Sequence, residues 1–347
     1  LIPHYRLGFF EELNKSFELD LFAKYNSKEK YNFKIIPSKT YKIFNTFYWQ
    51  ENLLKVNFEK YALVIFNVNL RYLSTVLALI KCKKNSIPTI DFNHKRSSTS
   101  KLIFIFLRDI FLKFFTNGKI FYMKNEYQEN LNKKIFNCIR PYNLGYANNS
   151  IDTYAISKLR KKYLAKERVD FIYIGRVTSK ANLKLLILAL NYSKKNYKVN
   201  IVGDYKNNSN SLKEIIDKYN LNKRVKWYKF SNNELEISQI FNKCRCFVYP
   251  GEVGLSIIHA MSYGLPSIIH NNNRHHNPEH YAFSDGYHGI TFKENNPKSL
   301  AKKMDHLYSL TDKELEKYSE NCLKKINDNF SIQLMAQNFK KSINKLI

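Results

Sequence analysis

Residues 249–270, with the sequence Y-P-G-E-V-G-L-S-I-I-H-A-M-S-Y-G-L-P-S-I-I-H, constrain the fold more than any other part of the chain. A short β-rich run precedes a turn with two glycines, and a helical pattern then covers residues 255–263. Gly264 and Pro266 end that helix, since glycine accepts the left-handed conformation after a helix and proline cannot continue it. Residues 267–270 begin another strand, so the segment predicts a strand–turn–helix–strand unit of a parallel sheet.

The turn in this unit has two interpretations that the sequence leaves open. Gly251 and Gly254 allow the backbone to pass close to a ligand, because they have no Cβ. The turn leads into the first residues of a helix, whose N–H groups and dipole favour an anion. In the second interpretation, the glycines only shape the turns of a buried unit.

The rest of the second half repeats this alternation of strands and helices. Apolar, β-rich runs predict strands at 170–174, 198–202, 225–228, 246–249, 267–270 and 289–292. Helical patterns lie between and after them at 182–194, 211–219, 233–242, 255–263 and 297–310, and residues 314–347 predict one or two further helices. Regular alternation of this kind predicts an α/β fold with a doubly wound parallel sheet.

The first half shows the same class of pattern less clearly. It predicts strands at 34–37, 61–67, 87–92 and 119–123, with helices at 70–82 and 127–134. Residues 1–17 predict a loop that opens a helix, and we expect the strand before that helix to lie largely upstream of Leu1. Residues 141–152 are rich in turn formers and predict a linker between two domains.

Composition limits the classes of partner. The formal net charge is +28 over 347 residues, which suits phosphorylated ligands, anionic lipid head groups or nucleic acid. No recognition helix or stacking motif supports nucleic-acid binding, so that class remains only as an alternative. The five scattered cysteines predict a reducing compartment and no disulfide framework.

Residues 101–117 combine phenylalanine, isoleucine and leucine with Lys101, Arg108 and Lys113. This composition is typical of a helix that lies in a membrane interface. A core helix with a few solvated cations is the alternative. The chain has no run of about 18 uncharged apolar residues, so the sequence predicts no membrane-spanning helix.

A second feature that carries chemistry is I-G-R-V-T-S-K at residues 174–180. Gly175 follows a strand, and Arg176 and Lys180 lie in the loop behind it. A guanidinium forks onto phosphate oxygens and an ammonium adds a point charge, so this loop predicts a phosphate clamp. Solvated surface cations are the alternative in so basic a chain.

The ordered motifs Y-I-G-R-V-T-S-K, V-N-I-V-G-D, V-Y-P-G-E-V-G-L-S-I-I-H-A-M-S-Y-G-L-P-S-I-I, N-P-E-H and S-D-G-Y-H-G-I-T-F resemble glycosyltransferase family 4. The resemblance implies the GT-B fold, with two Rossmann-like doubly wound domains facing a cleft. Residues 1–150 would bind the acceptor, residues 151–325 would bind the nucleotide sugar, and a C-terminal helix at 326–347 would return to the first domain.

The resemblance also implies an activity. The chain would be a retaining, metal-independent hexosyltransferase that uses a UDP- or GDP-sugar and no cofactor. Its acceptor would be a glycan or a lipid-linked glycan of bacterial surface polysaccharide, such as O-antigen, capsule or lipooligosaccharide. It would act in the cytoplasm or at the inner face of the plasma membrane. A GT-B epimerase or phosphorylase is the alternative reaction.

Donor residues follow from the same motifs. Arg176 matches the family arginine that neutralises the donor diphosphate. The family lysine falls on Ala181, so Lys180 is its predicted replacement.

The family's two glutamates fall on Gly251 and His259, and Glu252 is the predicted substitute for the first. His259 is expected to face the ribose of the nucleotide. The other donor-binding residues that the resemblance implies are Gly175, Val253, Gly254, Leu255 and Glu279.

For the other side of the reaction, His94 resembles the first-domain histidine that approaches the transferred sugar, and a loop-capping histidine is the alternative. His4, Tyr5 and Arg6 are the predicted acceptor-binding residues. The histidines between residues 270 and 280 suggest a metal site at first sight, but no D-x-D pair is present and GT-B enzymes generally need no metal. We therefore predict none.

Overall fold

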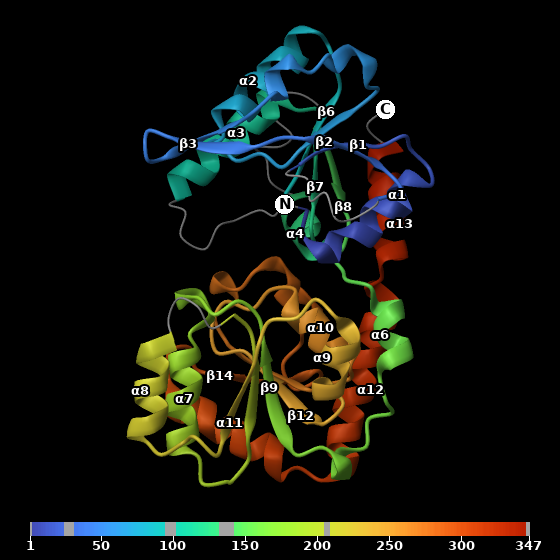
Figure 1. The fold of residues 1–347 in the computed structure, drawn as a ribbon. Helices are drawn as coiled ribbons and strands as arrows, with labels where there is room; N and C mark the ends of the chain where they lie inside the picture. Colours follow the sequence, from blue (N-terminus) through green and yellow to red (C-terminus); the bar gives the residue numbers. More distant parts are fainter. Residues whose placement is uncertain (1, 24–30, 94–101, 132–141, 205–208, 345–347) are drawn as a thin grey trace. The chain divides into compact units, whose positions relative to one another are not determined.

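The computed structural model describes residues 2–23, 31–93, 102–131, 142–204 and 209–344 (Figure 1). The chain divides into two compact units. The first unit contains Leu1–Asn149 together with Ile332–Ile347, and the second contains Ser150–Ser331.

The second unit is built on a six-stranded parallel sheet with the order β11-β10-β9-β12-β13-β14. The strands are β9 (Asp170–Ile174), β10 (Val199–Val202), β11 (Val225–Tyr228), β12 (Cys244–Val248), β13 (Ser267–His270) and β14 (Gly289–Phe292). This is the doubly wound Rossmann order 3-2-1-4-5-6, in which the chain reverses direction across the sheet between its first and fourth strands. The reversal point here lies between the neighbouring strands β9 and β12.

Helices cover both faces of this sheet (Figure 1). One face carries α7 (Leu183–Tyr192), α8 (Ser209–Lys218) and α11 (Pro297–Ser309); the other carries α6 (Thr153–Leu159), α9 (Glu234–Phe241), α10 (Ser256–Ser262) and α12 (Asp312–Asn329). Local sequence fixes where several of them begin. The side chains of Asn233 and Asn296 accept backbone hydrogen bonds at the starts of α9 and α11, and Thr311 and Glu314 form a capping box at α12.

The first unit contains a four-stranded parallel sheet in sequence order, β5 (Val64–Phe66), β6 (Thr89–Phe92), β7 (Gly118–Phe121) and β8 (Asn143–Tyr146). On one face, α1 (Leu7–Asn14) packs with the C-terminal helix α13 (Ile332–Asn344), as Figure 1 shows. On the other face lie α2 (Leu73–Lys84) and α3 (Leu102–Phe115). The short helix α4 (Lys124–Leu131) follows β7 in the chain and packs against β7 and β8.

Several elements of the first unit differ from the sequence prediction. The turn-rich segment 141–152 contains β8 as well as the boundary between the two units. Gly145 in this strand allows α13 to pack closely, because a Cβ there would collide with Ser342 of α13. The sequence also gave no sign of β1 (Asp20–Ala23), which pairs in parallel with β2 (Lys34–Pro37), or of the antiparallel pair β3 (Thr40–Ile43) and β4 (Phe47–Gln50).

The α3 helix differs from the simple picture of a cationic interfacial helix. Lys113 is only 1% exposed, and Arg108 pairs with its neighbour Asp109 at 3.3 Å. Among the side chains of residues 106–115 of this helix, the exposed ones are apolar: Phe106 and Leu107 are each 50% exposed and Phe114 is 51% exposed. Lys101 lies outside the described residues. In the described part of the chain, no helix is both long and apolar enough to cross a membrane.

Candidate active site

The candidate site lies where the loop after β9 meets the turn after β12. Open α/β sheets bind ligands at the carboxyl ends of the strands that flank the reversal point. Here the two segments are joined directly, because the backbone N–H of Glu252 donates to the carbonyl oxygen of Lys180 at 2.9 Å. Residues 72 positions apart in sequence therefore form one surface.

Gly251 is required by this contact. A Cβ at this position would collide with the carbonyl oxygen of Lys180 and would lie 2.7 Å from the carbonyl carbon of Ala181. Both obstacles are backbone atoms, which cannot swing aside as the end of a side chain can. The glycine therefore allows the β12 turn to lie against the β9 loop.

Arg176 follows β9 at a turn that two buried tyrosines hold. Gly175 has φ +155°, which favours glycine, and the Tyr173 hydroxyl donates to the carbonyl oxygen of Arg176 at 3.0 Å. The rings of Tyr173 and Tyr249 lie 4.9 Å apart. Burial raises the pKa of both phenols, and the positive charge of Arg176 acts in the opposite direction. The Arg176 side chain itself is exposed.

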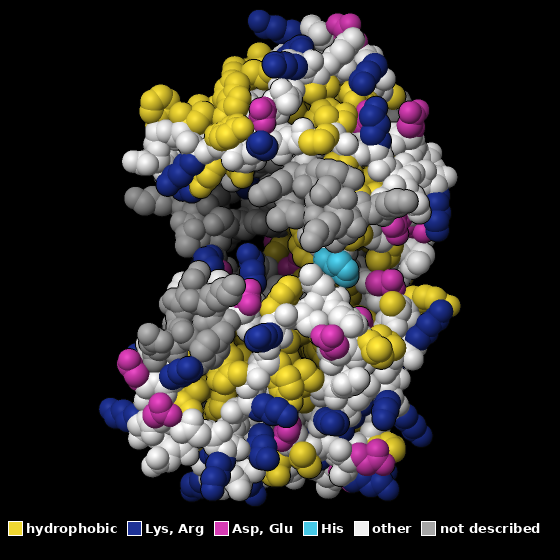
Figure 2. All heavy atoms as spheres, viewed as in Figure 1, with side chains coloured by type: hydrophobic (Ala, Val, Ile, Leu, Met, Phe, Trp, Pro, Cys, Tyr) yellow, Lys and Arg dark blue, Asp and Glu magenta, His cyan; other side chains and the backbone are white. Residues whose placement is uncertain are grey.

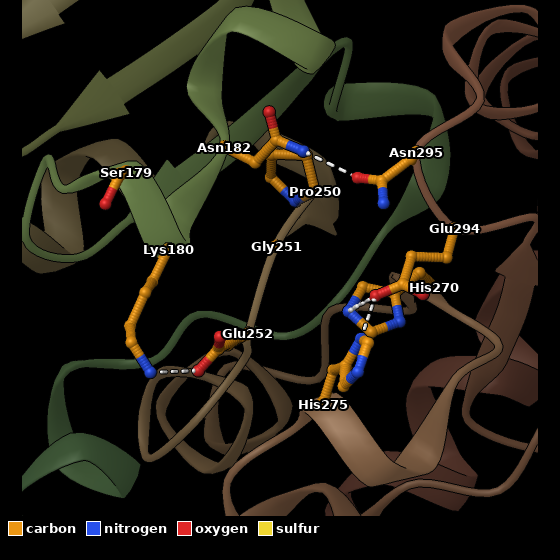
Figure 3. Close-up of a pocket in the computed structure, with 10 residues that line it drawn as sticks. All are labelled: Ser179, Lys180, Asn182, Pro250, Gly251, Glu252, His270, His275, Glu294 and Asn295. Carbon is orange, nitrogen blue, oxygen red and sulfur yellow. Dashed lines mark hydrogen bonds and ion pairs between the residues drawn. The ribbon is translucent and has the colours of Figure 1, made fainter. Parts of the chain in front are cut away.

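Lys180 and Glu252, the two predicted substitutes for family residues, pair with each other. Their Nζ and Oε2 atoms are 2.9 Å apart, with the lysine 50% and the glutamate 22% exposed (Figure 3). The short helical turn η5 (Ser179–Ala181) carries the lysine, and the β12 turn carries the glutamate. The pair places one cation and one anion beside the glycine turn.

The backbone amides of the turn divide into two kinds. Val253 N–H donates to Nδ1 of His276 at 3.2 Å, and Nε2 of His276 lies 2.9 Å from the carbonyl oxygen of His270. The Val253 amide is therefore committed to the protein. The N–H groups of Gly254 and Leu255 are of the second kind. They lie at the start of α10, where the first N–H groups of a helix have no acceptor within the helix.

A pocket of ≈ 220 Å³ lies beside the Lys180–Glu252 pair (Figure 3). It is lined by His270 at the end of β13 and by residues after β9, β12, β13 and β14. On one wall, Glu294 Oε1 lies 2.6 Å from Nδ1 of His275, and Glu294 Oε2 accepts from the Asn272 amide at 2.8 Å. Burial would raise the pKa of Glu294, but these hydrogen bonds outweigh it and lower that pKa.

His259 is held by a helix that the sequence did not connect with it. Its Nε2 lies 2.8 Å from Oε1 of Glu234, the first residue of α9. The Tyr263 hydroxyl donates to the same oxygen at 2.6 Å, and Phe241 stacks on the Tyr263 ring at 4.4 Å. His259 stands where the family has a glutamate. A carboxylate nevertheless lies beside it, and that carboxylate belongs to Glu234 of α9.

The remaining predicted residues lie in different surroundings. Glu279 is 5% exposed in the helical turn η7 (Pro278–Ala282). His94 lies outside the described residues. In the first unit, η1 (His4–Arg6) exposes His4 and Tyr5, but Arg6 is only 6% exposed. Its guanidinium lies 4.9 Å from the centre of the Tyr122 ring, so it packs η1 against the end of the sheet.

The histidines of the second unit form a packed group. His270 and His276 stack with ring centres 3.8 Å apart. Burial lowers the pKa of His270 to about 4 and that of His276 to about 3, so both rings are neutral at pH 7. Within the described ranges, no three His, Cys, Asp or Glu side chains are arranged to hold a metal ion.

The missed contributors to the site are Tyr173, Glu234, His275, Glu294, Asn182 and Asn295. Position after a predicted strand was the available signal for Glu294 and Asn295, since both follow β14. Asn182 is the first residue of the helix predicted at 182–194, and in the structure it is the N-cap of α7. No sequence pattern linked Glu234 to His259.

Comparisons with known proteins agree with this geometry. Residues 156–325 match the family model described as Glycosyl transferases group 1. Among solved structures, a glycosyltransferase from Rickettsia africae ESF-5 superposes with a TM-score of 0.76 and 17% identity, covering 98% of this chain and 94% of that one.

Two further structures show the same fold. Anabaena Alr3699/HepE in complex with UDP-glucose gives a TM-score of 0.71 at 15% identity, covering 99% of this chain and 96% of that one. The lipopolysaccharide outer core galactosyltransferase WaaB gives 0.61 at 14% identity, covering 84% and 77%. No curated protein matches the chain in sequence. The chain thus has the GT-B fold seen in these glycosyltransferases, and its residues 156–325 match the family of glycosyl transferases group 1.

Proposed function

We propose that this glycosyltransferase moves a sugar, with retention of configuration, from a UDP- or GDP-sugar to a glycan or lipid-linked glycan of bacterial surface polysaccharide. The observation that carries the proposal is the junction of the Arg176 loop with the Gly251–Leu255 turn at the reversal point of the sheet. HepE was solved with UDP-glucose, and WaaB is a lipopolysaccharide galactosyltransferase, which supports a nucleotide-sugar donor and a surface-glycan product.

In this mechanism the diphosphate of the donor contacts Arg176 and the N–H groups of Gly254 and Leu255. Negative charge grows on the leaving phosphate as its bond to the sugar breaks. A fixed guanidinium and fixed N–H dipoles stabilise that charge more strongly than they stabilise the ground state, which lowers the barrier. The acceptor hydroxyl attacks from the side that the phosphate leaves and gives its proton to that phosphate, so the configuration is retained. Arg176 and the two N–H groups neutralise the leaving phosphate in place of a metal.

Lys180 has a conditional role. Its ammonium is paired with Glu252, so its charge reaches a phosphate only if the lysine turns away from that partner. The side chain is 50% exposed and has four rotatable bonds, so this movement requires no change in the backbone. We assign the first neutralising contact to Arg176 and a second, exchangeable one to Lys180.

Arg176→Ala tests the donor site. We expect kcat/KM to fall by roughly 10²–10³-fold, as when one fixed donor to a developing oxyanion is removed. Lys313→Ala, an exposed cation on α12, is the matched control and should leave activity unchanged. Activity of Arg176→Ala within twofold of wild type would contradict the diphosphate assignment. Incubation with donor and no acceptor, followed by product analysis, separates transfer from epimerisation.

We also propose that the first unit works at an anionic membrane surface. The exposed Phe106, Leu107 and Phe114 of α3 provide the apolar contact. Figure 2 shows hydrophobic side chains gathered over α2 and α3 on this face. The net charge of +28 supplies the attraction to anionic head groups. His4 and Tyr5, both exposed, are the proposed acceptor contacts in this unit.

Vesicle sedimentation tests the membrane proposal. Wild-type protein should sediment with phosphatidylglycerol-containing vesicles at low salt and be released as the salt concentration rises. Phe106→Ser/Leu107→Ser should weaken binding by about tenfold, since two large apolar side chains no longer enter the interface. Leu235→Ser, an exposed leucine on α9 of the second unit, is the matched control and should leave binding unchanged. No sedimentation of wild type at low salt would contradict the proposal.

A further inference from the structure

We propose that the pocket beside the Lys180–Glu252 pair binds the sugar of the donor, and that it selects a neutral, hydroxyl-rich ring and rejects a uronic acid. This inference rests on the proposed function, because it takes the ligand to be a nucleotide sugar. It adds residues of the β13 and β14 loops to the site and restricts the class of sugar that the enzyme accepts.

The pocket lies where the sugar of a bound donor would be expected. The pocket shares Lys180, Gly251 and Glu252 with the junction that is proposed to hold the diphosphate. In a nucleotide sugar the ring is bonded directly to the outer phosphate, so it must lie in a space that adjoins that junction. The pocket begins at the Lys180–Glu252 pair and extends to the loops after β13 and β14 (Figure 3).

The side chains that line the pocket suit a sugar. Hydroxyl and amide groups come from Ser179, Asn182 and Asn295, and carboxylate oxygens come from Glu252 and Glu294. A sugar hydroxyl both donates and accepts hydrogen bonds, so it suits walls that offer donors and acceptors together. Glu252 is paired with Lys180, so Glu294 supplies the carboxylate charge that would repel a uronic acid or a further phosphate. A nucleobase would need broad apolar or aromatic walls.

The Glu294 carboxylate, which would accept hydrogen bonds from the sugar, is held rigidly. Both oxygens of Glu294 are held, one near His275 Nδ1 at 2.6 Å and the other by the Asn272 amide at 2.8 Å. Each carboxylate oxygen has more than one lone pair, so these contacts fix the group and still leave it able to accept from a hydroxyl. A fixed acceptor selects hydroxyl positions, because it cannot follow a misplaced one.

Two of the residues that line the pocket have an unusual backbone conformation. Asn182 and Asn295 adopt the left-handed conformation with φ of 51° and 56°, and the Asn182 amide donates to the Asn295 side-chain oxygen at 3.2 Å. This hydrogen bond ties the start of α7 to the loop after β14, across 113 positions of sequence. Non-glycine residues held in this region tend to cluster at ligand sites.

The size of the pocket agrees with one ring. At ≈ 220 Å³ it is smaller than the roughly 300–1,000 Å³ that accommodates a complete drug-sized ligand. It therefore fits one part of a nucleotide sugar, with the remainder lying outside it along the junction.

The experiment separates the affinity for nucleotide from the affinity added by the sugar. Calorimetric titration would measure binding of UDP, GDP, and their glucose and glucuronate derivatives to the purified chain. The variants are Glu294→Gln and Asn295→Gly, because glycine keeps the left-handed backbone while removing the amide. Glu320→Gln, an exposed carboxylate on α12, is the matched control.

We expect wild type to bind the glucose derivative more tightly than the nucleotide alone, and the glucuronate derivative more weakly than the glucose derivative. Both pocket variants should reduce the glucose contribution by roughly 5- to 50-fold, since a hydrogen-bond partner is lost. Their affinity for the nucleotide alone should stay within twofold, and Glu294→Gln should narrow the discrimination against glucuronate. Glu320→Gln should behave as wild type.

The outcomes distinguish a wrong pocket assignment from a wrong proposed function. If both variants retain the sugar contribution and the discrimination, the pocket assignment is wrong while the proposed function stands. If wild type binds no nucleotide or nucleotide sugar of the panel, the proposed function is wrong, and the pocket assignment with it.

Discussion

Gly251→Ala is the substitution that tests the site architecture most directly. The new Cβ would collide with the carbonyl oxygen of Lys180 and approach the carbonyl carbon of Ala181 to 2.7 Å. Since no side chain can move aside, the β12 turn must shift away from the β9 loop. The hydrogen bond from Glu252 N–H to Lys180 O, 2.9 Å long, lies at the same contact and would be stretched.

The magnitude follows from these contacts. Overpacking of a well-packed region costs typically 1–3 kcal/mol. For a unit of 150–250 residues, each kcal/mol shifts Tm by roughly 2–4 °C, so Tm should fall by about 2–12 °C. Because Glu252 moves with the turn, affinity for the nucleotide sugar should fall as well.

Gly254→Ala is the matched control in the same turn. A Cβ there would first meet the side-chain amide of Asn277 at 3.2 Å, and the end of an exposed asparagine can rotate. We expect Tm to change by less than about 2 °C, the effect of a surface substitution within roughly 0.5 kcal/mol. Both variants would be followed by calorimetry or circular dichroism. The reasoning would be refuted if Gly251→Ala melted no lower than Gly254→Ala.

Two further predictions concern buried charges. The pKa values of His270 and His276, about 4 and about 3, lie below the ordinary 6.5, so the unfolded state binds more protons between pH 6.5 and 4. Stability should be constant above pH 7 and fall by about 1–2 kcal/mol per histidine at pH 5, seen as lower urea midpoints; a midpoint that rises on acidification would contradict this. In the first unit, Lys119 and Asp91 form an ion pair at 3.3 Å with 2% and 1% exposure, so Lys119→Met should cost about 3–5 kcal/mol and Lys119→Met/Asp91→Leu should recover much of it. Equal urea midpoints for the single and double variants would argue against an uncompensated buried charge.

Much of the second unit follows from the sequence, because its strands are short apolar runs and all but the edge strand β11 are largely buried. The runs at residues 170–174, 225–228, 267–270 and 289–292 are strands with the predicted bounds. A continuous apolar run bounded by turn residues has few alternatives in an alternating α/β pattern. The helices agree to within a few residues, since caps such as Asn233 and Thr311 mark their starts.

The first unit was harder to predict because its short strands resemble turns. β8 (Asn143–Tyr146) has the sequence N-L-G-Y, and its glycine reads as a turn former. The structure gives that glycine another purpose, the close approach of α13, which returns from almost 200 positions along the chain. Arg6 also reads as a ligand-binding cation, but four aromatic rings surround its guanidinium. Neither contact is encoded in local sequence.

The site shows why residue types alone were insufficient. Lys180 and Glu252 each looked like an imperfect substitute, one position away from where the family has its residue. The strand order makes β9 and β12 neighbours, and the two displaced residues then meet at 2.9 Å. His259 likewise regains a carboxylate from Glu234, 25 positions earlier, because α9 and α10 lie on the same face of the sheet. Both departures from the family pattern are therefore paired in space. Neither pair would survive a change at one member alone, so the two positions of each pair should be changed together when the specificity of this enzyme is altered.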